Sequence, residues 1–178
     1  MEFRSFELNP NAPAQQEGTL EEALARKYGV SLEQARAMNA RVVDAAAGEG
    51  LHYRYDLAKR ANTFDAHRLI HLAAAAGLQA TMKERLMAAY FMEGRALGDR
   101  DTLVELAGEV GVDTERARAT LDSDAYAEDV REDEREASEL GITGVPFFVI
   151  NRRYGVSGAQ PPEVLIQALD VGWKDAPD

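Results

Sequence analysis

The sequence predicts an α/β fold in which a long helical region interrupts a small amount of β-structure. Three observations lead to this prediction. The apolar segment Phe3–Leu8 has the length of a strand, and helical signals then dominate residues 19–140. The apolar run Phe147–Ile150 is followed by a turn and a second strand-like segment, which together indicate a β-hairpin. A closing amphipathic helix completes the pattern.

Composition limits the function. The 178 residues include 31 acidic and 20 basic side chains, with a formal net charge of −11, and no cysteine. Acidity argues against nucleic acid as a partner, because a phosphate backbone is bound by basic patches. No stretch approaches the ~20 apolar residues of a membrane span. No basic segment leads into an apolar run as in a secretion signal, so we expect a cytoplasmic protein that does not bind membranes.

The elements follow in order. Phe3–Leu8 reads as a strand with imperfect alternation, and it ends at Asn9–Pro13, where two prolines and two asparagines indicate a loop. Capping-box spacings at Thr19/Glu22 and Ser31/Gln34 predict two helix starts. Further helices are predicted over Phe64–Ala76, Thr81–Leu97, Thr102–Val110, Thr114–Leu121 and Ser123–Leu140, with Gly77, Gly98 and Gly111 as stops and Asp101 and Asp113 as N-caps.

The C-terminal part begins with Gly141, which follows a polar helical pattern and tolerates a positive φ as a helix terminator. Pro146 has no N–H for a ladder, so it suits the first position of the strand that continues to Ile150. Residues 151–153 form the turn and residues 154–156 the second strand. A final helix opens at Pro161-Pro162, where proline is tolerated in the first turn.

Four stretches resemble one family. They are Phe3–Leu8, the run Asn-Thr-Phe-Asp-Ala-His-Arg-Leu at Asn62–Leu69, Ala89-Tyr90-Phe91 with Gly94, and the block Gly141–Ala159. Together they resemble the DsbA-like branch of the thioredoxin superfamily, and most closely its FrnE-type dithiol-disulfide isomerases. The resemblance implies a thioredoxin-like part, residues 1–18 and 141–178, and a helical insertion with its connecting helix, residues 19–140, within one structural unit.

One feature of that family is not found in this sequence. Family members begin with a strand and a Cys-X-X-Cys motif, whose thiolate is made acidic by a helix N-terminus, before the strand that Phe3–Leu8 resembles. Here Met1 directly precedes that segment. We expect a fragment of a longer protein, because the remaining motifs are intact; the alternative is a natural cysteine-free descendant. Either way, Phe3–Leu8 and Phe147–Ile150 would lack a central partner strand, which makes oligomers through unpaired edges an expectation.

The resemblance implies a substrate-binding role for Gly144, Val145 and Pro146. General frequencies favour a trans Val145–Pro146 bond, whereas the family implies a cis bond that turns the backbone of Val145 outward to pair with an extended substrate. Asn62 and His67 resemble residues beside the family's cleft. For His67 a proton-transfer role competes with simple packing. A metal at the His67/His71 pair is not expected, since no third ligand is near in sequence.

Three functions follow from these observations. The first is a FrnE-like thiol-disulfide oxidoreductase or isomerase that acts on a cysteine-containing peptide or protein, with this chain supplying the substrate loop but no nucleophile. The second is a relative of the glutathione-linked enzymes, 2-hydroxychromene-2-carboxylate isomerase or kappa-class transferase. The third is a non-catalytic peptide-binding module. No bound cofactor is expected, with glutathione as a candidate co-substrate, and whether the chain itself is an enzyme is left open.

Overall fold

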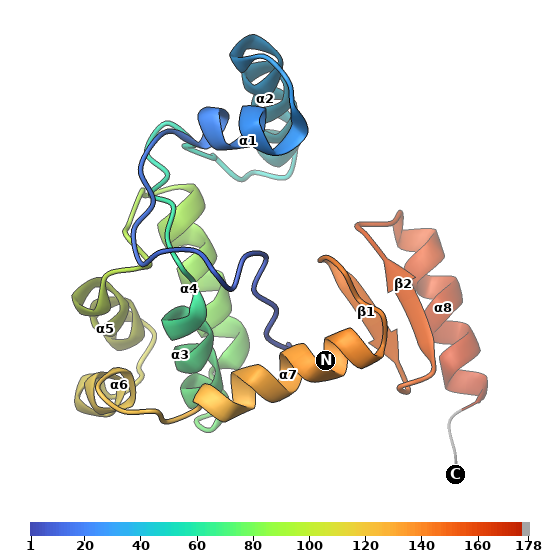
Figure 1. Cartoon of the computed structure of the whole chain (residues 1–178). Coiled ribbons are helices and arrows are strands. Elements are labelled where there is room, and N and C mark those ends of the chain that lie inside the picture. The colour runs from blue at the N-terminus through green and yellow to red at the C-terminus, as the bar shows by residue number, and fades with distance from the viewer. Residues whose placement is uncertain (176–178) are drawn as a thin grey trace. The chain divides into compact units, whose positions relative to one another are not determined.

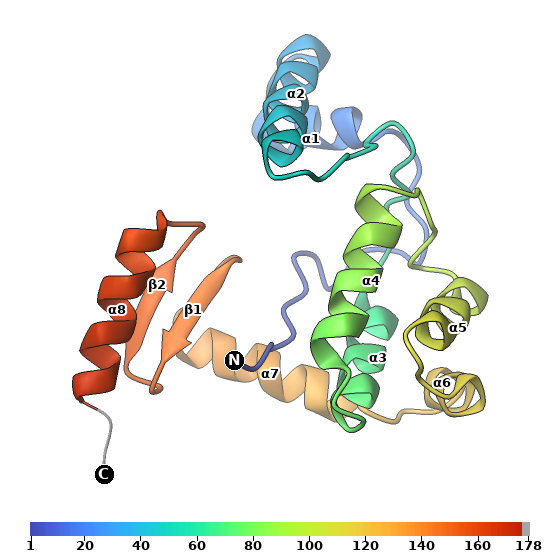
Figure 2. The ribbon, with the colours of Figure 1, turned by 180° about the vertical axis from the view of Figure 1, so that it is seen from behind.

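The computed structural model describes residues 1–175 and has two compact units, Met1–Arg131 and a second that begins at Glu132. Figures 1 and 2 show its elements from two sides. In chain order these are α1 (Leu20–Tyr28), α2 (Leu32–Gly48), α3 (Phe64–Ala74), α4 (Gln79–Phe91), α5 (Arg100–Glu109), α6 (Thr114–Leu121), α7 (Ala127–Glu139), β1 (Phe147–Ile150), β2 (Tyr154–Ser157) and α8 (Pro162–Lys174). The predicted α/β class is confirmed, and the described residues are mostly helical with a small two-stranded sheet.

The core of the first unit lies among α3, α4, α5 and α6, which pack around fully buried apolar side chains. These include Leu69, Met82, Leu103, Leu106 and Leu121. One cation is buried among them: the Arg68 guanidinium donates to the carbonyl oxygens of Thr120, Ser123 and Ala125 at the end of α6. Helix ends leave carbonyls without partners, so Arg68 satisfies groups that would otherwise be buried without hydrogen bonds.

The hairpin of α1 and α2 is a separate substructure of this unit. The two helices pack against each other and, among residues 1–175, against no other helix or strand. Both predicted capping boxes are confirmed, with Thr19 accepting from the backbone of Glu22 and Ser31 from that of Gln34. Gly29 ends α1 with φ +64°, a conformation that favours glycine.

Two chain segments, residues 13–16 and 60–62, connect this hairpin to the rest of the unit, and we call them the neck. The backbone N–H of Asn62 donates to the carbonyl of Pro13 at 3.0 Å, and that of Gln16 donates to the carbonyl of Arg60 at 2.9 Å. Gly98 lies against the neck so closely that a Cβ there would be 2.0 Å from the carbonyl oxygen of Ala14. Three backbone segments therefore cross in close contact at this point.

Phe3–Leu8 is not a strand, which corrects the prediction. The segment forms no ladder; instead side chains hold it in place. The Gln79 amide contacts both backbone polar groups of Phe3, at 3.2 Å to the N–H and 2.9 Å to the carbonyl. The side chain of Glu7, 0% exposed, accepts from Arg131 at 2.9 Å and from Asn62 at 3.3 Å. A strand needs a neighbouring strand, and no described element pairs with this one.

Several helix boundaries also differ from the prediction: α3 ends at Ala74, α7 begins at Ala127 rather than Ser123, and two further differences have a local cause. α4 ends at Phe91 rather than Leu97, since Gly94 takes φ +66° and lies against Leu57, where a Cβ would come within 2.6 Å. The N-cap of α5 is Asp99, whose carboxylate accepts from the backbone of Thr102 at 3.1 Å, and not Asp101. The predicted cap Asp113 is confirmed at α6. The predicted end of α4 lies six residues beyond the observed one and the predicted cap of α5 two residues beyond it, because local patterns place helix ends only approximately.

The second unit contains the antiparallel pair β1–β2 and α8. The register pairs Phe147 with Ser157 and Ile150 with Tyr154. α8 packs on the face that carries Ile150, since a Cβ on Gly172 would come within 2.4 Å of that side chain. Leu165 and Ala168 are half-buried at helical spacing from Gly172. Leu169, on the same helix, is 57% exposed.

Candidate functional site

The candidate site begins where α7 ends. The N–H of Gly141, at φ +70°, donates to the carbonyl of Ser138, and the N–H of Ile142 donates to that of Ala137 at 2.8 Å. This pair of hydrogen bonds is the Schellman arrangement that closes a helix and redirects the chain. The loop from Gly141 to Pro146 thus leaves α7 in a defined direction, as the predicted helix stop at Gly141 implies.

The Val145–Pro146 peptide bond is cis, which confirms the isomer implied by the family resemblance. The carbonyl of Pro146 accepts from the N–H of Gly158 at 2.9 Å, so the β1–β2 ladder extends one pair beyond the strands. This pairing fixes the loop against the end of β2.

A cavity of about 270 Å³ lies beside this loop. Its lining residues come from the loop, the start of β1 and the end of β2: Gly141, Thr143, Gly144, Val145, Pro146, Phe147, Ser157 and Gly158. The predicted residues Gly144, Val145 and Pro146 are therefore brought together around one cavity. Ser157 and Gly158 were not predicted, although the hairpin register, counted back from the turn at residues 151–153, places both opposite Phe147 and Pro146.

Val145 is the residue of the loop best placed to meet a ligand. The residue is 50% exposed, and within residues 1–175 neither its N–H nor its carbonyl is hydrogen-bonded. An exposed backbone donor and acceptor on one residue can pair with an extended peptide as a neighbouring strand does. Phe147 adds an apolar wall, with its ring lying over Gly155, where a Cβ would come within 2.8 Å.

The chemistry of the cavity is that of a binding surface. Its side chains are hydroxyls and apolar groups, and no carboxylate, imidazole or cation lines it. The chain contains no thiol. Thiol–disulfide exchange needs a thiolate, so the arrangement can hold a substrate by its backbone but cannot itself attack a disulfide.

Asn62 and His67, the other two predicted site residues, belong to the first unit. The Asn62 side chain is used within the fold: it donates to Glu7 and to the carbonyl of Pro10, and accepts from the N–H of Phe64 at 2.8 Å. It thereby caps α3, where the N-cap residue Thr63 makes no side-chain cap. A role for Asn62 in substrate binding stays a prediction.

His67 lies in the first turn of α3, where its backbone N–H donates to the carbonyl of Thr63, and it is half-buried. One turn on, the His71 ring lies 3.1 Å from the hydroxyl of Ser5 and stacks on Tyr126. His71 therefore takes part in fixing the N-terminal segment. A proton-transfer role for His67 stays a prediction.

Residues 1–175 contain neither a cluster of metal ligands nor a membrane-spanning helix. No group of three or more His, Cys, Asp or Glu side chains in residues 1–175 is placed to hold a metal ion. Within the same residues, no helix combines the length and apolar character needed to cross a membrane.

Comparison with known proteins identifies the family to which this chain is similar. The model of the DSBA-like thioredoxin domain matches residues 1–170. A crystal structure of a candidate DsbA oxidoreductase from Streptomyces coelicolor is 45% identical, with a TM-score of 0.92, and the match covers 98% of this chain and 76% of that one. A candidate protein disulfide isomerase from Nitrosomonas europaea, 18% identical with a TM-score of 0.65, shares the fold over 80% of this chain and 75% of its own.

One curated relative is similar over part of its length. It is the uncharacterized protein YwbO of Bacillus subtilis, 34% identical over 86 residues. The match covers 48% of this chain and 42% of the relative, so this chain matches less than half of that protein.

Proposed function

This chain belongs to the DSBA-like thioredoxin domain family, and we propose that it is the substrate-binding body of a FrnE-like thiol–disulfide oxidoreductase or isomerase. Its substrate in this proposal is a cysteine-containing peptide or protein in the cytoplasm. The chain binds the substrate, and a thiol outside these 178 residues performs the exchange, since the sequence contains no cysteine.

A single observation is the main support for this proposal. Val145 presents an unpaired backbone N–H and carbonyl beside the cis bond to Pro146, at the rim of the cavity between the loop and the end of β2. A peptide laid along Val145 would form main-chain hydrogen bonds that do not depend on sequence. Small lining residues, Gly144 and Gly158, leave room for a side chain or a disulfide next to those bonds.

The chemistry of thiol–disulfide exchange shows which group must come from outside this chain, namely the attacking thiolate. A thiolate attacks one sulfur of the substrate disulfide, a mixed disulfide forms, and the other sulfur leaves as a thiolate. The backbone pairing at Val145 would hold the attacked disulfide in place, which reduces the entropy cost of the reaction. Glutathione or a cysteine of another polypeptide segment can provide the attacking thiolate.

The lack of cysteine also favours a second candidate, a peptide-binding module without chemistry. It uses the same loop and the same pairing at Val145 but involves no exchange. The glutathione-linked isomerase or transferase relatives form a third class, which predicts binding of glutathione rather than of longer peptides. All three candidate functions use the same loop, so they are distinguished by which ligand the chain binds.

The test is a binding measurement with the whole chain. A fluorescent extended peptide whose single cysteine is S-methylated should bind wild type, as measured by anisotropy. Val145→Pro, which removes the backbone N–H, should lower affinity by about tenfold, because losing one such hydrogen bond costs about 1–1.5 kcal/mol. Val145→Ala keeps the N–H and serves as the matched control, with affinity within about threefold of wild type.

Three outcomes are informative. Equal losses in Val145→Pro and Val145→Ala would mean that the side chain, and not the backbone, binds the peptide. Binding of reduced glutathione without peptide binding would select the glutathione-linked class. If wild type binds neither ligand while circular dichroism shows the folded helices, the loop is not a substrate site in this chain.

A further inference from the structure

A second cavity, of about 350 Å³, lies at the neck and belongs entirely to the first unit. It is lined by Gln15, Gln16, Lys59, Arg60, Ala61, Ala96 and Gly98, which come from the two neck segments and the loop after α4. Its size is within the range of cavities that hold small molecules. Nothing in the function proposed above uses it.

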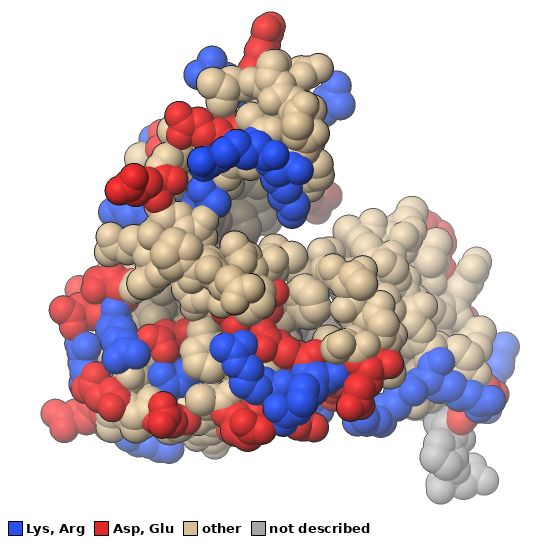
Figure 3. Space-filling view, in the orientation of Figure 1, with Lys and Arg blue, Asp and Glu red and all other residues tan. Residues whose placement is uncertain are grey.

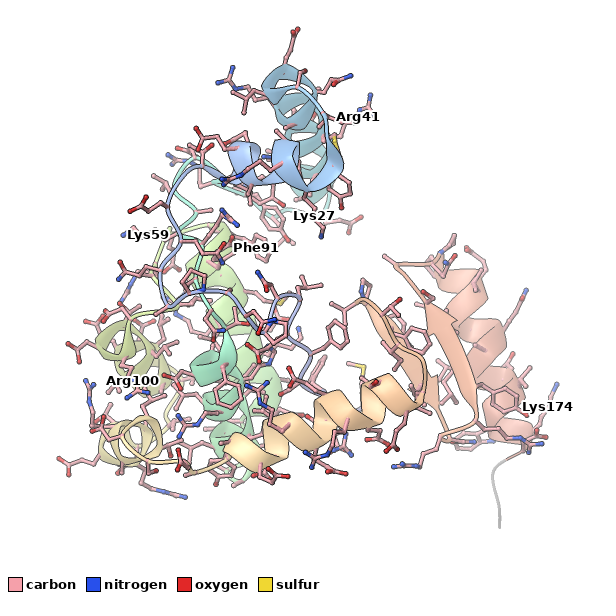
Figure 4. All side chains as sticks on the ribbon, in the orientation of Figure 1. Lys27, Arg41, Lys59, Phe91, Arg100 and Lys174 are labelled. Carbon is pink, nitrogen blue, oxygen red and sulfur yellow. The ribbon has the colours of Figure 1, made fainter. Side chains whose placement is uncertain are left out.

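The polar lining of this cavity consists of donors with no acidic partner. Lys59 and Arg60 supply two cations, Gln15 and Gln16 supply two amides, and no carboxylate lines the cavity. Lys59, labelled beside the neck in Figure 4, makes no ion pair or hydrogen bond within residues 1–175. The Arg60 guanidinium donates to the neutral side-chain oxygen of Gln16. Both charges of the cavity are therefore uncompensated by an anion.

Several other cations of the same unit are neutralised by ion pairs, although Arg41 and Arg116 are not paired with any carboxylate in the described part of the chain. Arg85, Arg95, Arg100 and Arg118 each form an ion pair with a carboxylate on a helix that does not contain the arginine itself. Figure 3 shows the result as red and blue side chains interspersed over the helices of this unit. The net charge of −11 does not cancel the local field, because charges beyond about 10 Å are screened at ordinary ionic strength.

Backbone contacts hold the walls of the cavity together. Two backbone hydrogen bonds join the neck segments, and Gly98 touches the carbonyl of Ala14 as described above. Burial raises the pKa of the neighbouring core residue Tyr90, and the positive charge of Arg60 acts against that rise. A site whose walls are already held together by such contacts loses less conformational entropy when a ligand binds.

We propose that the neck cavity binds a small organic molecule through an oxyanion group, a carboxylate or a phosphate. Lys59 and Arg60 contact the anionic oxygens, and the Gln15 and Gln16 amides donate further hydrogen bonds. Guanidinium and ammonium groups are the donors that proteins use for such anions. A bound anion would link residues 15–16 to residues 59–60 and so stabilise the connection to the α1–α2 hairpin.

The experiment is an NMR titration of the full chain with inorganic phosphate and, separately, with succinate, up to about 20 mM at constant ionic strength set with chloride. Saturable shifts at the amides of Gln16, Ala61, Ala96 and Gly98 are expected with at least one of the two anions. Saturation by phosphate points to a phosphate ester, and saturation by succinate points to an organic acid. Linear shifts, equal to those that chloride gives, would overturn the proposal.

Variants make the test specific. Lys59→Gln with Arg60→Gln should reduce the affinity by at least about tenfold, since both charge-assisted contacts are lost. Arg41→Gln with Arg116→Gln removes two cations that have no acidic partner elsewhere in the unit, with the same change in net charge, and should leave the affinity unchanged. Equal weakening in both double variants would show a general charge effect and overturn the site.

A single variant guards against misfolding at Arg60. Lys59→Glu keeps the Arg60–Gln16 contact and should abolish saturable binding while the amide shifts of α3 and α4 stay as in wild type. Retained binding in this variant would overturn the proposal. The peptide-binding test at Val145 uses the other unit, so either proposal can fail without the other.

Discussion

The side-chain amide of Gln79 pairs with both backbone polar groups of Phe3, accepting from its N–H and donating to its carbonyl. This is the hydrogen-bonding pattern that a neighbouring strand would supply, provided here by the first residue of α4. The N-terminal segment is thus held by side chains at a few points, through Gln79, His71, Asn62 and Arg131.

Replacing Gln79 by alanine should therefore loosen the N-terminal segment locally. Two hydrogen bonds are lost, each of which contributes about 1 kcal/mol to the stability of the segment. Hydrogen exchange should speed up at Phe3 and leave the amides of α3 unchanged, and in wild type Phe3–Leu8 should already exchange faster than α3 and α4. Gln167→Ala, on α8, is the control. Equal protection of Phe3–Leu8 and the helices would contradict this account.

The pair Glu7–Arg131 should show an asymmetric response to mutation. Glu7 is 0% exposed and Arg131 is 41% exposed, so removing the arginine leaves a buried carboxylate without this cation, whereas removing the glutamate leaves a cation that reaches water. We expect Arg131→Ala to cost about 3 kcal/mol and Glu7→Gln to cost less, in urea unfolding followed by circular dichroism. If Glu7→Gln lowered the free energy of unfolding more than Arg131→Ala, the unpaired arginine would be the more costly of the two charges, and this explanation would be wrong.

The cap of α5 gives a pH-dependent prediction. Hydrogen bonds from the side chain and backbone of Thr102 lower the pKa of Asp99. A lowered pKa in the folded state contributes stability above the unfolded pKa, and this contribution is lost as the pH falls through the folded value. Asp99→Ala should therefore cost about 1 kcal/mol at neutral pH, with the difference from wild type shrinking in acid.

The matched control for this cap is Asp101→Ala, two residues on. Asp101 is 81% exposed and its contact is with Arg118 at the surface, so the change should cost well under about 1 kcal/mol. Thermal unfolding at neutral and acid pH measures both variants. Equal losses would mean that helix charge in the first turn, and not the Asp99 cap, stabilises α5.

The purified chain should not accelerate disulfide reduction. Exchange requires a thiolate and the sequence has no cysteine. Insulin precipitation by dithiothreitol should proceed at the rate seen in buffer alone, and scrambled ribonuclease should not regain activity faster. Catalysis above that background would contradict the binding-only role that we propose for this chain.

Local patterns predicted the parts of the fold that local chemistry decides. The capping boxes at Thr19 and Ser31 and the helix stop at Gly141 follow from hydrogen bonds within a few residues, and the structure has all three. The β1–β2 hairpin was predicted for the same reason, since its two strands and turn are contiguous.

Features that depend on distant partners were not predictable in this way. Phe3–Leu8 has the composition of a strand, but a ladder needs a partner that the pattern does not show. The apolar period of α4 continues past Phe91, but the helix ends there, where the N–H of Arg54 donates to the carbonyl of Phe91 at 2.7 Å and Gly94 lies against Leu57. The cis bond before Pro146 follows from the family resemblance, since general frequencies favour trans.

The site was predictable to the same degree. Gly144, Val145 and Pro146 are consecutive and line one cavity, while Ser157 and Gly158 enter it through the register of β2. The neck cavity had no sequence signal, because its lining residues come from three segments far apart in the chain.

The neck affects which parts of this chain can be lengthened, shortened or replaced without disturbing the rest of the unit. The hairpin of α1 and α2 leaves and re-enters the helical body through two hydrogen-bonded neighbours, Pro13 with Asn62 and Gln16 with Arg60. The two ends of the hairpin segment already lie side by side, so a replacement needs only to bridge a short gap. The entropy cost of closing such a loop rises only slowly with its length. The two helices α1 and α2 are therefore the exchangeable part of this segment, whereas residues 53–57 belong with the body, because Tyr53 stacks on Phe91 and Leu57 lies against Gly94.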